Sequence, residues 1–255
     1  MKLGVMQGRL TEPINNCIQE FPSKWMLEFQ HLRELKLNHI EWLVTKNSFH
    51  TNPLLSKDYL LYSLPISSIC ADNLVDHRIS DENFLKNNLI PICEAALKNM
   101  INNITIPLLE ESVLEDDIKH RAFSKAMVKI GRNFPTINFT FESEMKPDRL
   151  LEIVDLADNF YVTYDTGNIT SCGFSHVDYI NFFKNKINNV HLKDRTRGGE
   201  TVIPTLGDTD FKTIFQTLKE IGYNRFYTMQ TARGHTGCEF ETIREHKSIF
   251  EKIYE

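Results

Sequence analysis

The feature that most constrains the fold is an alternation, along the whole chain, of short apolar runs with segments of helical periodicity. Eight runs have the length and composition of buried strands. Regular alternation of strand and helix is typical of α/β folds with a parallel sheet. The predicted strands are Leu3–Met6, His39–Val44, Ile66–Cys70, Asn103–Ile106, Ile137–Glu142, Phe160–Asp165, Asn189–His191 and Arg225–Gln230.

Helical patterns separate these strands. A serine with acidic neighbours begins one of them, Gly131 suggests the end of another, and Pro147 suits a first helical turn. Eight strands alternating with helices over 255 residues predict a single (β/α)8 TIM barrel domain that spans residues 1–255. A doubly wound open sheet is the alternative, but the chain has neither a GxGxxG turn nor a P-loop. The predicted helices are Ser23–Leu35, Ser80–Lys98, Ser112–Ile130, Pro147–Leu156, Ser175–Phe183, Asp210–Ile221 and Glu241–Tyr254.

Composition narrows the functional class. Apolar residues make up 41% and charged residues 25% of the chain, which is typical of a globular protein. A formal charge of −5 argues against nucleic acid as the main partner, and no apolar run reaches the ~18 residues of a membrane span. The first predicted strand begins at Leu3 and leaves no room for a secretory signal. Five scattered cysteines with no CxxC pair predict reduced thiols, and hence a cytoplasmic protein.

Polar residues close several of the predicted strands. In a (β/α)8 barrel, the carboxyl-terminal ends of the strands face the active site. Glu142, Asp165 and His191 end three successive strands, and their oxygen and imidazole groups together could hold a divalent metal. A single glutamate at such a place is more often solvated, and a single histidine is more often a satisfied core residue. The prediction depends on the three occurring together.

Further polar and basic residues lie near other strand ends. Arginine side chains suit phosphate or carboxylate groups, so an anionic ligand is expected. Arg195 and Arg197 precede Gly198 and Gly199, and solvation on a mobile loop is the alternative for these two. The remaining candidates at the mouth of the barrel are Gln7, Arg9, Glu41, Asn168, Lys193 and Arg233.

These strand-end motifs resemble those of the xylose isomerase-like TIM barrel superfamily, the sugar phosphate isomerase/epimerase family. The resemblance covers essentially the whole chain. The superfamily also includes tagatose 3-epimerase-like enzymes, inosose dehydratases and endonuclease IV-type nucleases. The motifs that carry the resemblance are F-E-S-E at Glu142, Y-D-T-G-N at Asp165, V-H-L-K-D at His191 and L-G-D-T-D-F at Leu206–Phe211, with G-V-M-Q-G-R-L and P-L-L-E-E as weaker ones.

The resemblance implies a divalent metal, such as Mn, Mg, Co or Zn, held by four strand-end residues. Carried over to this chain, the first three ligands fall on Glu142, Asp165 and His191, and the fourth falls on Gln230. In the epimerase-like members the first and the fourth ligand are both glutamates. These two glutamates also form an acid–base pair beside a carbonyl. The resemblance thus implies Glu142 as the base and Lys193 as its electrostatic partner or acid. The substrate contacts expected from position are Gln7, Arg9, Glu41, Asn168, Arg195 and Arg233.

Gln230 departs from this pattern, because an amide brings no charge to the metal and takes up no proton near neutral pH. Two-base epimerisation is therefore in question. The hypothesis is a metal-assisted isomerase or epimerase that acts on a sugar or sugar phosphate, with homo-oligomerisation possible. The alternatives are a dehydratase that acts on a keto-sugar or inosose, and a non-catalytic or metal-free binder of a sugar phosphate or sugar acid. A nuclease is disfavoured by the negative charge.

Overall fold

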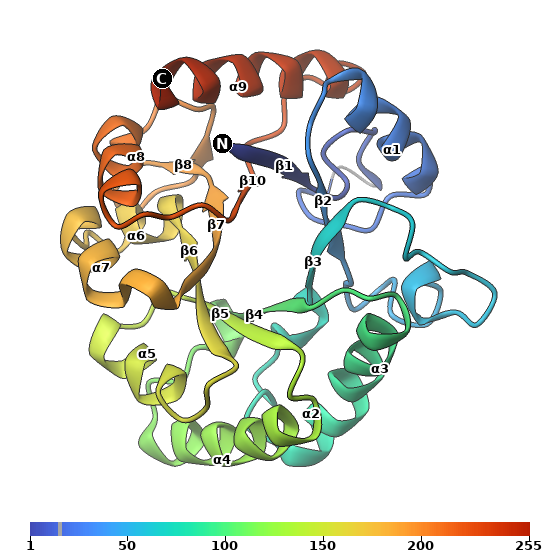
Figure 1. Cartoon of the computed structure of the whole chain (residues 1–255), viewed down its shortest axis with the longest axis vertical. Helices are drawn as coiled ribbons and strands as arrows, with labels where there is room; N and C mark the ends of the chain where they lie inside the picture. Colours follow the sequence, from blue (N-terminus) through green and yellow to red (C-terminus); the bar gives the residue numbers. More distant parts are fainter. Residues whose placement is uncertain (15–16) are drawn as a thin grey trace. The chain divides into compact units, whose positions relative to one another are not determined.

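The computed structural model describes residues 1–14 and 17–255. Eight parallel strands form a closed barrel in the order β1-β10-β7-β6-β5-β4-β3-β2, and this confirms the predicted TIM barrel (Figure 1). A short antiparallel pair, β8–β9, stands outside this sheet. The strands are β1 (Lys2–Met6), β2 (Ile40–Leu43), β3 (Ile66–Cys70), β4 (Asn103–Leu108), β5 (Asn138–Ser143), β6 (Phe160–Asp165), β7 (Ile187–Leu192), β8 (Asp194–Arg195), β9 (Thr201–Val202) and β10 (Phe226–Met229).

Helices follow most of the strands, and none in the described part of the chain combines the length and apolar character needed to cross a bilayer. The chain divides into two compact units, Met1–Glu41 with Thr163–Glu255, and Trp42–Val162. One domain over residues 1–255 stays a prediction. The helices are α1 (Trp25–Glu34), α2 (Glu82–Asn88), α3 (Ile90–Lys98), α4 (Asp117–Asn133), α5 (Pro147–Val154), α6 (Thr166–Ser171), α7 (His176–Phe183), α8 (Phe211–Glu220) and α9 (Glu239–Tyr254).

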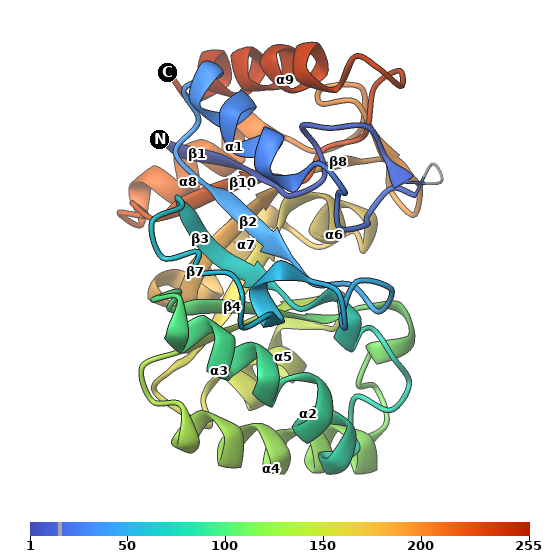
Figure 2. The same ribbon diagram turned by 90° about the vertical axis from the view of Figure 1, so that its right-hand side faces the viewer.

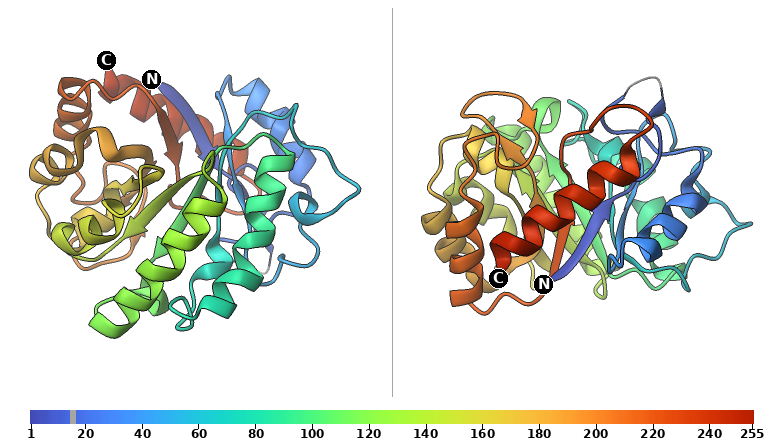
Figure 3. Two further views of the ribbon diagram at one scale, coloured as in Figure 1. Left: turned by 60° about the horizontal axis from the view of Figure 1, so that its bottom comes forward. Right: turned by 90° about the horizontal axis from the view of Figure 1, so that it is seen from above.

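In the unit that contains both termini, β1 pairs in parallel with β10 and β2, and β10 pairs with β7. Helix α9 runs alongside β1 and β10 (Figure 3). Aromatic rings fill the layer between α8, α9 and β10: Phe211 lies 5.0 Å from Phe250, and Phe215 lies 5.8 Å from Tyr227, both centroid to centroid. Burial of such large apolar side chains is the main source of stability for this layer.

In the unit formed by Trp42–Val162, strands β3 to β6 pair in parallel, and α2, α3 and α4 lie together on one side of β3 and β4 (Figure 2). The alternation predicted for β5 is confirmed. Phe141 packs against Phe123 of α4, with ring centroids 6.1 Å apart. On the other face Thr140 donates to the hydroxyl of Thr105 at 3.2 Å. Apolar residues of β5 therefore face the helices, and polar residues point the opposite way.

The predicted helix Ser80–Lys98 is two helices, α2 and α3, which meet at Leu89. Asp81 caps α2 by accepting the backbone N–H of Asn83 and of Phe84. Pro91 lacks a backbone N–H and cannot continue the hydrogen-bond ladder of α2, so the chain begins a new helix there.

The predicted helix Ser112–Ile130 is shifted along the chain. Helix α4 begins after Asp116, which accepts the N–H groups of Ile118 and Lys119. It continues to Asn133, so Gly131 lies inside the helix and does not end it. A Cβ at Gly131 would lie 2.8 Å from a ring carbon of Phe160. The glycine thus permits close packing of α4 on β6.

Candidate functional site

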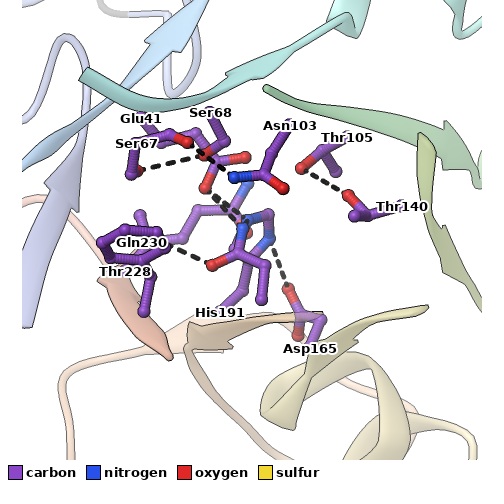
Figure 4. A network of polar contacts seen from close by, with 12 residues as sticks. Glu41, Ser67, Ser68, Asn103, Thr105, Thr140, Asp165, His191, Thr228 and Gln230 are labelled. Atoms are coloured by element: carbon purple, nitrogen blue, oxygen red, sulfur yellow. Dashed lines mark hydrogen bonds and ion pairs between the residues drawn. The ribbon is translucent and has the colours of Figure 1, made fainter. Parts of the chain in front are cut away.

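The carboxyl-terminal ends of β6 and β7 bring together three of the predicted site residues. Asp165 closes β6, and its Oδ1 accepts the backbone N–H of Asn168 at 2.8 Å. Lys193 directly follows β7, and its Nζ lies 2.9 Å from Asp165 Oδ2. His191 Nδ1 lies 4.0 Å from the same oxygen (Figure 4). A buried carboxylate, an imidazole and an ammonium therefore meet at one point.

The charge state of Asp165 follows from these neighbours. Burial by itself raises the pKa of Asp165, since it disfavours the charged form. The positive charge of Lys193, the interaction with His191 and the hydrogen bonds from Lys193 and Asn168 outweigh burial, and the pKa falls below its ordinary value. Asp165 is thus an anion at neutral pH, as a metal ligand must be.

Strand β2 supplies a second buried carboxylate, on the other ring nitrogen of His191. Glu41 Oε2 lies 2.9 Å from His191 Nε2, and neither side chain has exposed surface. Asn189 donates its amide N–H to the same oxygen at 2.8 Å. From the sequence, Glu41 was predicted as a substrate contact, whereas Asn189 was predicted only as the first residue of a strand. The signal for Asn189 was present, because it shares a face of β7 with His191.

Gln230 directly follows β10, and only 6% of it is exposed. Its backbone N–H donates to the carbonyl of Leu192 at 3.0 Å, and its side-chain Nε2 donates to Gln19 Oε1 at 3.0 Å. Within residues 1–14 and 17–255, its buried Oε1 accepts no hydrogen bond. A buried carbonyl oxygen without a donor is costly, and a bound cation or hydroxyl group would relieve that cost.

Glu142 belongs to the other unit, where it lies near the carboxyl-terminal end of β5 and is buried. It shares a strand face with Thr140, on the opposite side from Phe141. The strand is followed by a tight turn in which the Ser143 hydroxyl accepts the N–H of Met145 at 3.0 Å. The predicted base is thus held on a strand rather than on a loop.

Two of the predicted anion-binding arginines donate to backbone carbonyls of the loop that follows β1. Arg9 is buried and donates to the carbonyl of Thr231 at 3.2 Å and to that of Ile18. Arg233 donates to Ile18 at 3.1 Å and to Thr11 at 3.4 Å. Each guanidinium carries five N–H donors. These arginines connect the loop to the end of β10, and their contact with an anionic ligand stays a prediction.

The other predicted substrate contacts have internal partners as well. Arg195 donates to the side chain of Asn168 at 3.0 Å and to the carbonyl of Gly199 at 3.2 Å. Gln7 is fully buried after β1, and its backbone N–H donates to the carbonyl of Glu41 at 3.0 Å. These contacts order the loops at the strand ends. Substrate binding by these residues likewise stays a prediction.

Glu28, a fully buried carboxylate of α1, was not among the predicted site residues. Its Oε2 accepts the N–H of Gly8 at 2.9 Å. Its Oε1 accepts the N–H of Leu10 at 3.0 Å and the hydroxyl of Thr11 at 3.2 Å. Burial raises the pKa of Glu28 to about 7, against the lowering by these hydrogen bonds and by the charge of Arg233. Glu28 therefore holds the loop after β1 and titrates near neutral pH.

Because the folded-state pKa of Glu28 lies above its ordinary value, its protonated form favours folding. That contribution is complete below about pH 4.5 and is lost as the pH rises to about 7. We expect the unfolding free energy of the wild type, relative to Glu28→Gln, to fall over this window by of the order of 3 kcal/mol. Urea unfolding of both proteins at several pH values measures this difference. A difference that does not change with pH would contradict the expectation.

Comparison with known proteins is consistent with this arrangement of strand ends. Residues 132–250 match the model of the family described as xylose isomerase-like TIM barrel. This segment includes Glu142, Asp165, His191 and Gln230. Residues 132–250 are thus similar to that family, and the chain has the fold of a TIM barrel. Solved structures of the same kind superimpose on essentially all of it.

Two solved structures illustrate the likeness of this barrel to known proteins. The 3-keto-D-glucoside 4-epimerase YcjR from E. coli is 15% identical, with a TM-score of 0.70, over 99% of each chain. An IOLI protein with a bound zinc atom is 16% identical, with a TM-score of 0.73, over 100% of this chain and 98% of that one. At such identities the likeness establishes the fold alone.

Two curated relatives of this barrel are inosose dehydratases. The enzyme of Geobacillus thermodenitrificans is 29% identical, over 32% of this chain and 34% of its own length. The enzyme of Clostridium tetani is 24% identical, over 46% of this chain and 48% of its own length. The chain thus matches between a third and a half of the length of these relatives.

The L-G-D-T-D-F motif at Leu206–Phe211 has a structural role. Asp194, which is fully buried after β7, accepts backbone N–H groups from Thr205 at 2.8 Å, Gly207 at 2.9 Å and Thr209 at 3.1 Å. A Cβ at Gly207 would lie 2.3 Å from Asp194 Oδ1, so only glycine fits there. Asp210 then caps α8 through the N–H of Thr213. The motif orders the loop between β7 and α8.

Proposed function

We propose that the chain is an enzyme in which Glu142, Asp165 and His191 hold a divalent metal, with Gln230 Oε1 as a fourth, neutral ligand. Each of the first three is buried and offers one ligand atom. Carboxylate oxygens and imidazole are suitable ligands for Mn, Mg, Co or Zn. The observation that carries the proposal is the buried Asp165–His191 pair, with 4.0 Å between Oδ2 and Nδ1.

The strand register supports the addition of Glu142 to this pair. Strand β5 pairs in parallel with β6, with Phe141 opposite Val162. Glu142 follows Phe141 by one residue, and Asp165 follows Val162 by three. Each carboxylate therefore lies at the carboxyl-terminal end of its own strand. In (β/α)8 barrels that end of the sheet carries the active site.

In this proposal the substrate is a small sugar or sugar phosphate that carries a carbonyl group. A bound divalent metal polarises such a carbonyl and makes the neighbouring C–H more acidic. Glu142 takes up the proton from that carbon as the general base. The ammonium of Lys193, 2.9 Å from Asp165 Oδ2, adds positive charge beside the reacting oxygen. The reaction class is an isomerisation or epimerisation that begins with one proton transfer.

A dehydratase is the second candidate function, and a specific observation favours it. Both curated relatives described above are inosose dehydratases. Removal of a proton next to a carbonyl is also the first step of a β-elimination, so Glu142 would keep the same role. Lys193 would then protonate the departing hydroxyl group, and water would leave. Mass analysis of the product separates the two candidates, because elimination removes one water.

Metal removal tests the proposed function. We expect the purified protein to hold about one divalent ion per chain, because the proposed site has one set of ligands. We further expect chelation to abolish exchange of a substrate C–H proton with D2O, and added Mn²⁺ to restore it. Proton NMR with a panel of ketoses, ketose phosphates and inososes measures the exchange.

Two outcomes would contradict this expectation. If proton exchange persisted after complete metal removal, the metal would not be required for the reaction. Ligand binding that ignores chelation, with no exchange for any compound of the panel, would favour a non-catalytic binder. Cytoplasmic location, homo-oligomerisation and the lack of a nucleic-acid partner stay predictions from the sequence.

A further inference from the structure

We propose that Glu41 is a positioning residue, which holds the proton of His191 on Nε2 and so makes Nδ1 the atom that faces the metal. The inference concerns the tautomer and orientation of His191. The predicted effect of Glu41 on metal affinity rests on the proposed function, since it assumes that His191 is a metal ligand. It assigns Glu41 to the orientation of His191 rather than to the substrate.

The contact between Glu41 and His191 determines the tautomer. Glu41 Oε2 lies 2.9 Å from His191 Nε2, and both side chains are fully buried. A carboxylate oxygen is an acceptor only, so the nitrogen that faces it must carry a hydrogen. The opposite tautomer would bring a nitrogen lone pair against a carboxylate oxygen without water to screen it. Nε2 therefore donates to Glu41.

Asn189 supports the same assignment. Its Nδ2 donates to Glu41 Oε2 at 2.8 Å and also lies 3.2 Å from His191 Nε2. Asn189 Nδ2 and His191 Nε2 both donate to Glu41 Oε2. The two nitrogens lie close together because they share this acceptor. The Thr228 hydroxyl donates to Asn189 Oδ1 at 3.4 Å, which is consistent with this orientation of the amide.

The Thr228 hydroxyl also has a second partner, because it lies 3.1 Å from His39 Nε2. Because that hydroxyl donates its proton to Asn189, it accepts from His39. Burial lowers the pKa of His39 to about 4, so this ring is neutral and can donate through Nε2. The donor order thus runs from His39 through Thr228 and Asn189 to Glu41.

The tautomer leaves the lone pair of His191 on Nδ1, the nitrogen that lies 4.0 Å from Asp165 Oδ2 (Figure 4). A carboxylate on the remote nitrogen of a metal-bound histidine fixes the ring orientation and makes the ligand more basic. Loss of such a partner typically lowers metal affinity by about 10- to 100-fold. We therefore assign Glu41, with Asn189, to the support of the metal-binding face of His191.

The first test reads the tautomer in the metal-free wild type. Long-range ¹⁵N–¹H correlation NMR of imidazole-labelled protein at neutral pH distinguishes protonated from unprotonated ring nitrogens. The signals of His191 are assigned by their loss in a His191→Asn variant. We expect a protonated Nε2 and an unprotonated Nδ1. An unprotonated Nε2, or hydrogens on both ring nitrogens, would overturn the inference, whether or not the protein binds metal.

The second test compares variants by Mn²⁺ titration calorimetry and by the same NMR experiment. Glu41→Leu removes the acceptor and keeps much of the volume, whereas Glu41→Gln can keep an acceptor oxygen opposite Nε2. We expect Glu41→Leu to lower Mn²⁺ affinity about 10- to 100-fold and to lose the tautomer preference, and Glu41→Gln to restore that preference. Glu28→Gln is the matched control, because it removes another fully buried carboxylate of the same unit.

The two tests separate the inference from the proposed function. A wild type that binds no Mn²⁺ would contradict the proposed metal site, while the NMR result would still decide the role of Glu41. If the wild type and Glu41→Leu bound Mn²⁺ with equal affinity, the role of Glu41 would be overturned and the proposed metal site would not. An equal loss of affinity in Glu28→Gln and Glu41→Leu would assign the effect to general destabilisation and overturn it too. Should Glu41→Leu not fold, Glu41→Gln and the wild type still decide.

Discussion

Replacement of Glu142 by glutamine is expected to lower the rate of substrate proton exchange by about 10²- to 10⁴-fold. The amide keeps the size and one ligand oxygen of the side chain, but it cannot accept a proton near neutral pH. Gln230 is likewise an amide, so the variant has no carboxylate at either of the two positions where the resemblance implies a base. The measurement is the exchange rate of a substrate C–H proton in D2O, at a Mn²⁺ concentration that saturates each protein.

Glu144→Gln is the matched control for this variant. Glu144 follows Glu142 by two residues on the same segment and is half-buried. It should exchange the proton at nearly the wild-type rate. If Glu142→Gln with saturating metal kept more than about a tenth of that rate, the assignment of the base would be wrong. If both variants lost the activity equally, the loss would reflect damage to the turn after β5.

Replacement of Gln230 by glutamate is expected to raise Mn²⁺ affinity by about tenfold or more, because the affinity of oxygen ligand sets increases with their negative charge. The variant also adds a second carboxylate that can take up a proton. We therefore expect a new exchange of the proton on the opposite face of the substrate carbon. Calorimetry measures the affinity, and NMR of stereospecifically deuterated substrate detects the second exchange.

The change at Gln230 also affects its contact with Gln19. Gln230 Nε2 donates to Gln19 Oε1 at 3.0 Å, and a carboxylate can only accept, so the Gln19 amide must rotate to donate. Gln19→Leu is the control, because it removes this contact and leaves the charge of the site unchanged. If Gln19→Leu and Gln230→Glu changed Mn²⁺ affinity equally, the effect would come from the loop that contains Gln19. Unchanged affinity in Gln230→Glu would exclude Gln230 from the metal site.

The periodicity of the chain predicted most of the fold, because strand and helix periods depend on neighbouring residues. Helix boundaries depended on features that a period does not contain. Pro91 divides one predicted helix by its missing N–H. Gly131 reads as a helix end in the sequence, yet it lies within α4 because Phe160 packs against it. The packing of Phe160 on Gly131 joins residues from different elements, so the residues next to Gly131 in the sequence do not predict it.

The strand-end residues were predictable for a similar reason, whereas their partners were not. Polar residues that close apolar strands stand out in the sequence, and Asp165, His191 and Lys193 were found in this way. Glu28 looks like an ordinary surface residue of an amphipathic helix. Its three hydrogen bonds to Gly8, Leu10 and Thr11 arise only when α1 packs under the loop after β1.

The sequence by itself determined the barrel, the strand on which each candidate lies, and the amide at Gln230 where the resemblance implies a carboxylate. Tertiary structure alone decided which groups meet. Glu41 and His191 lie 150 residues apart in the chain and 2.9 Å apart in space. Arg9 and Arg233, expected to bind an anion, donate to loop carbonyls. Hydrogen bonds depend on distance and direction in space, and a linear pattern constrains neither of these for residues far apart in the chain.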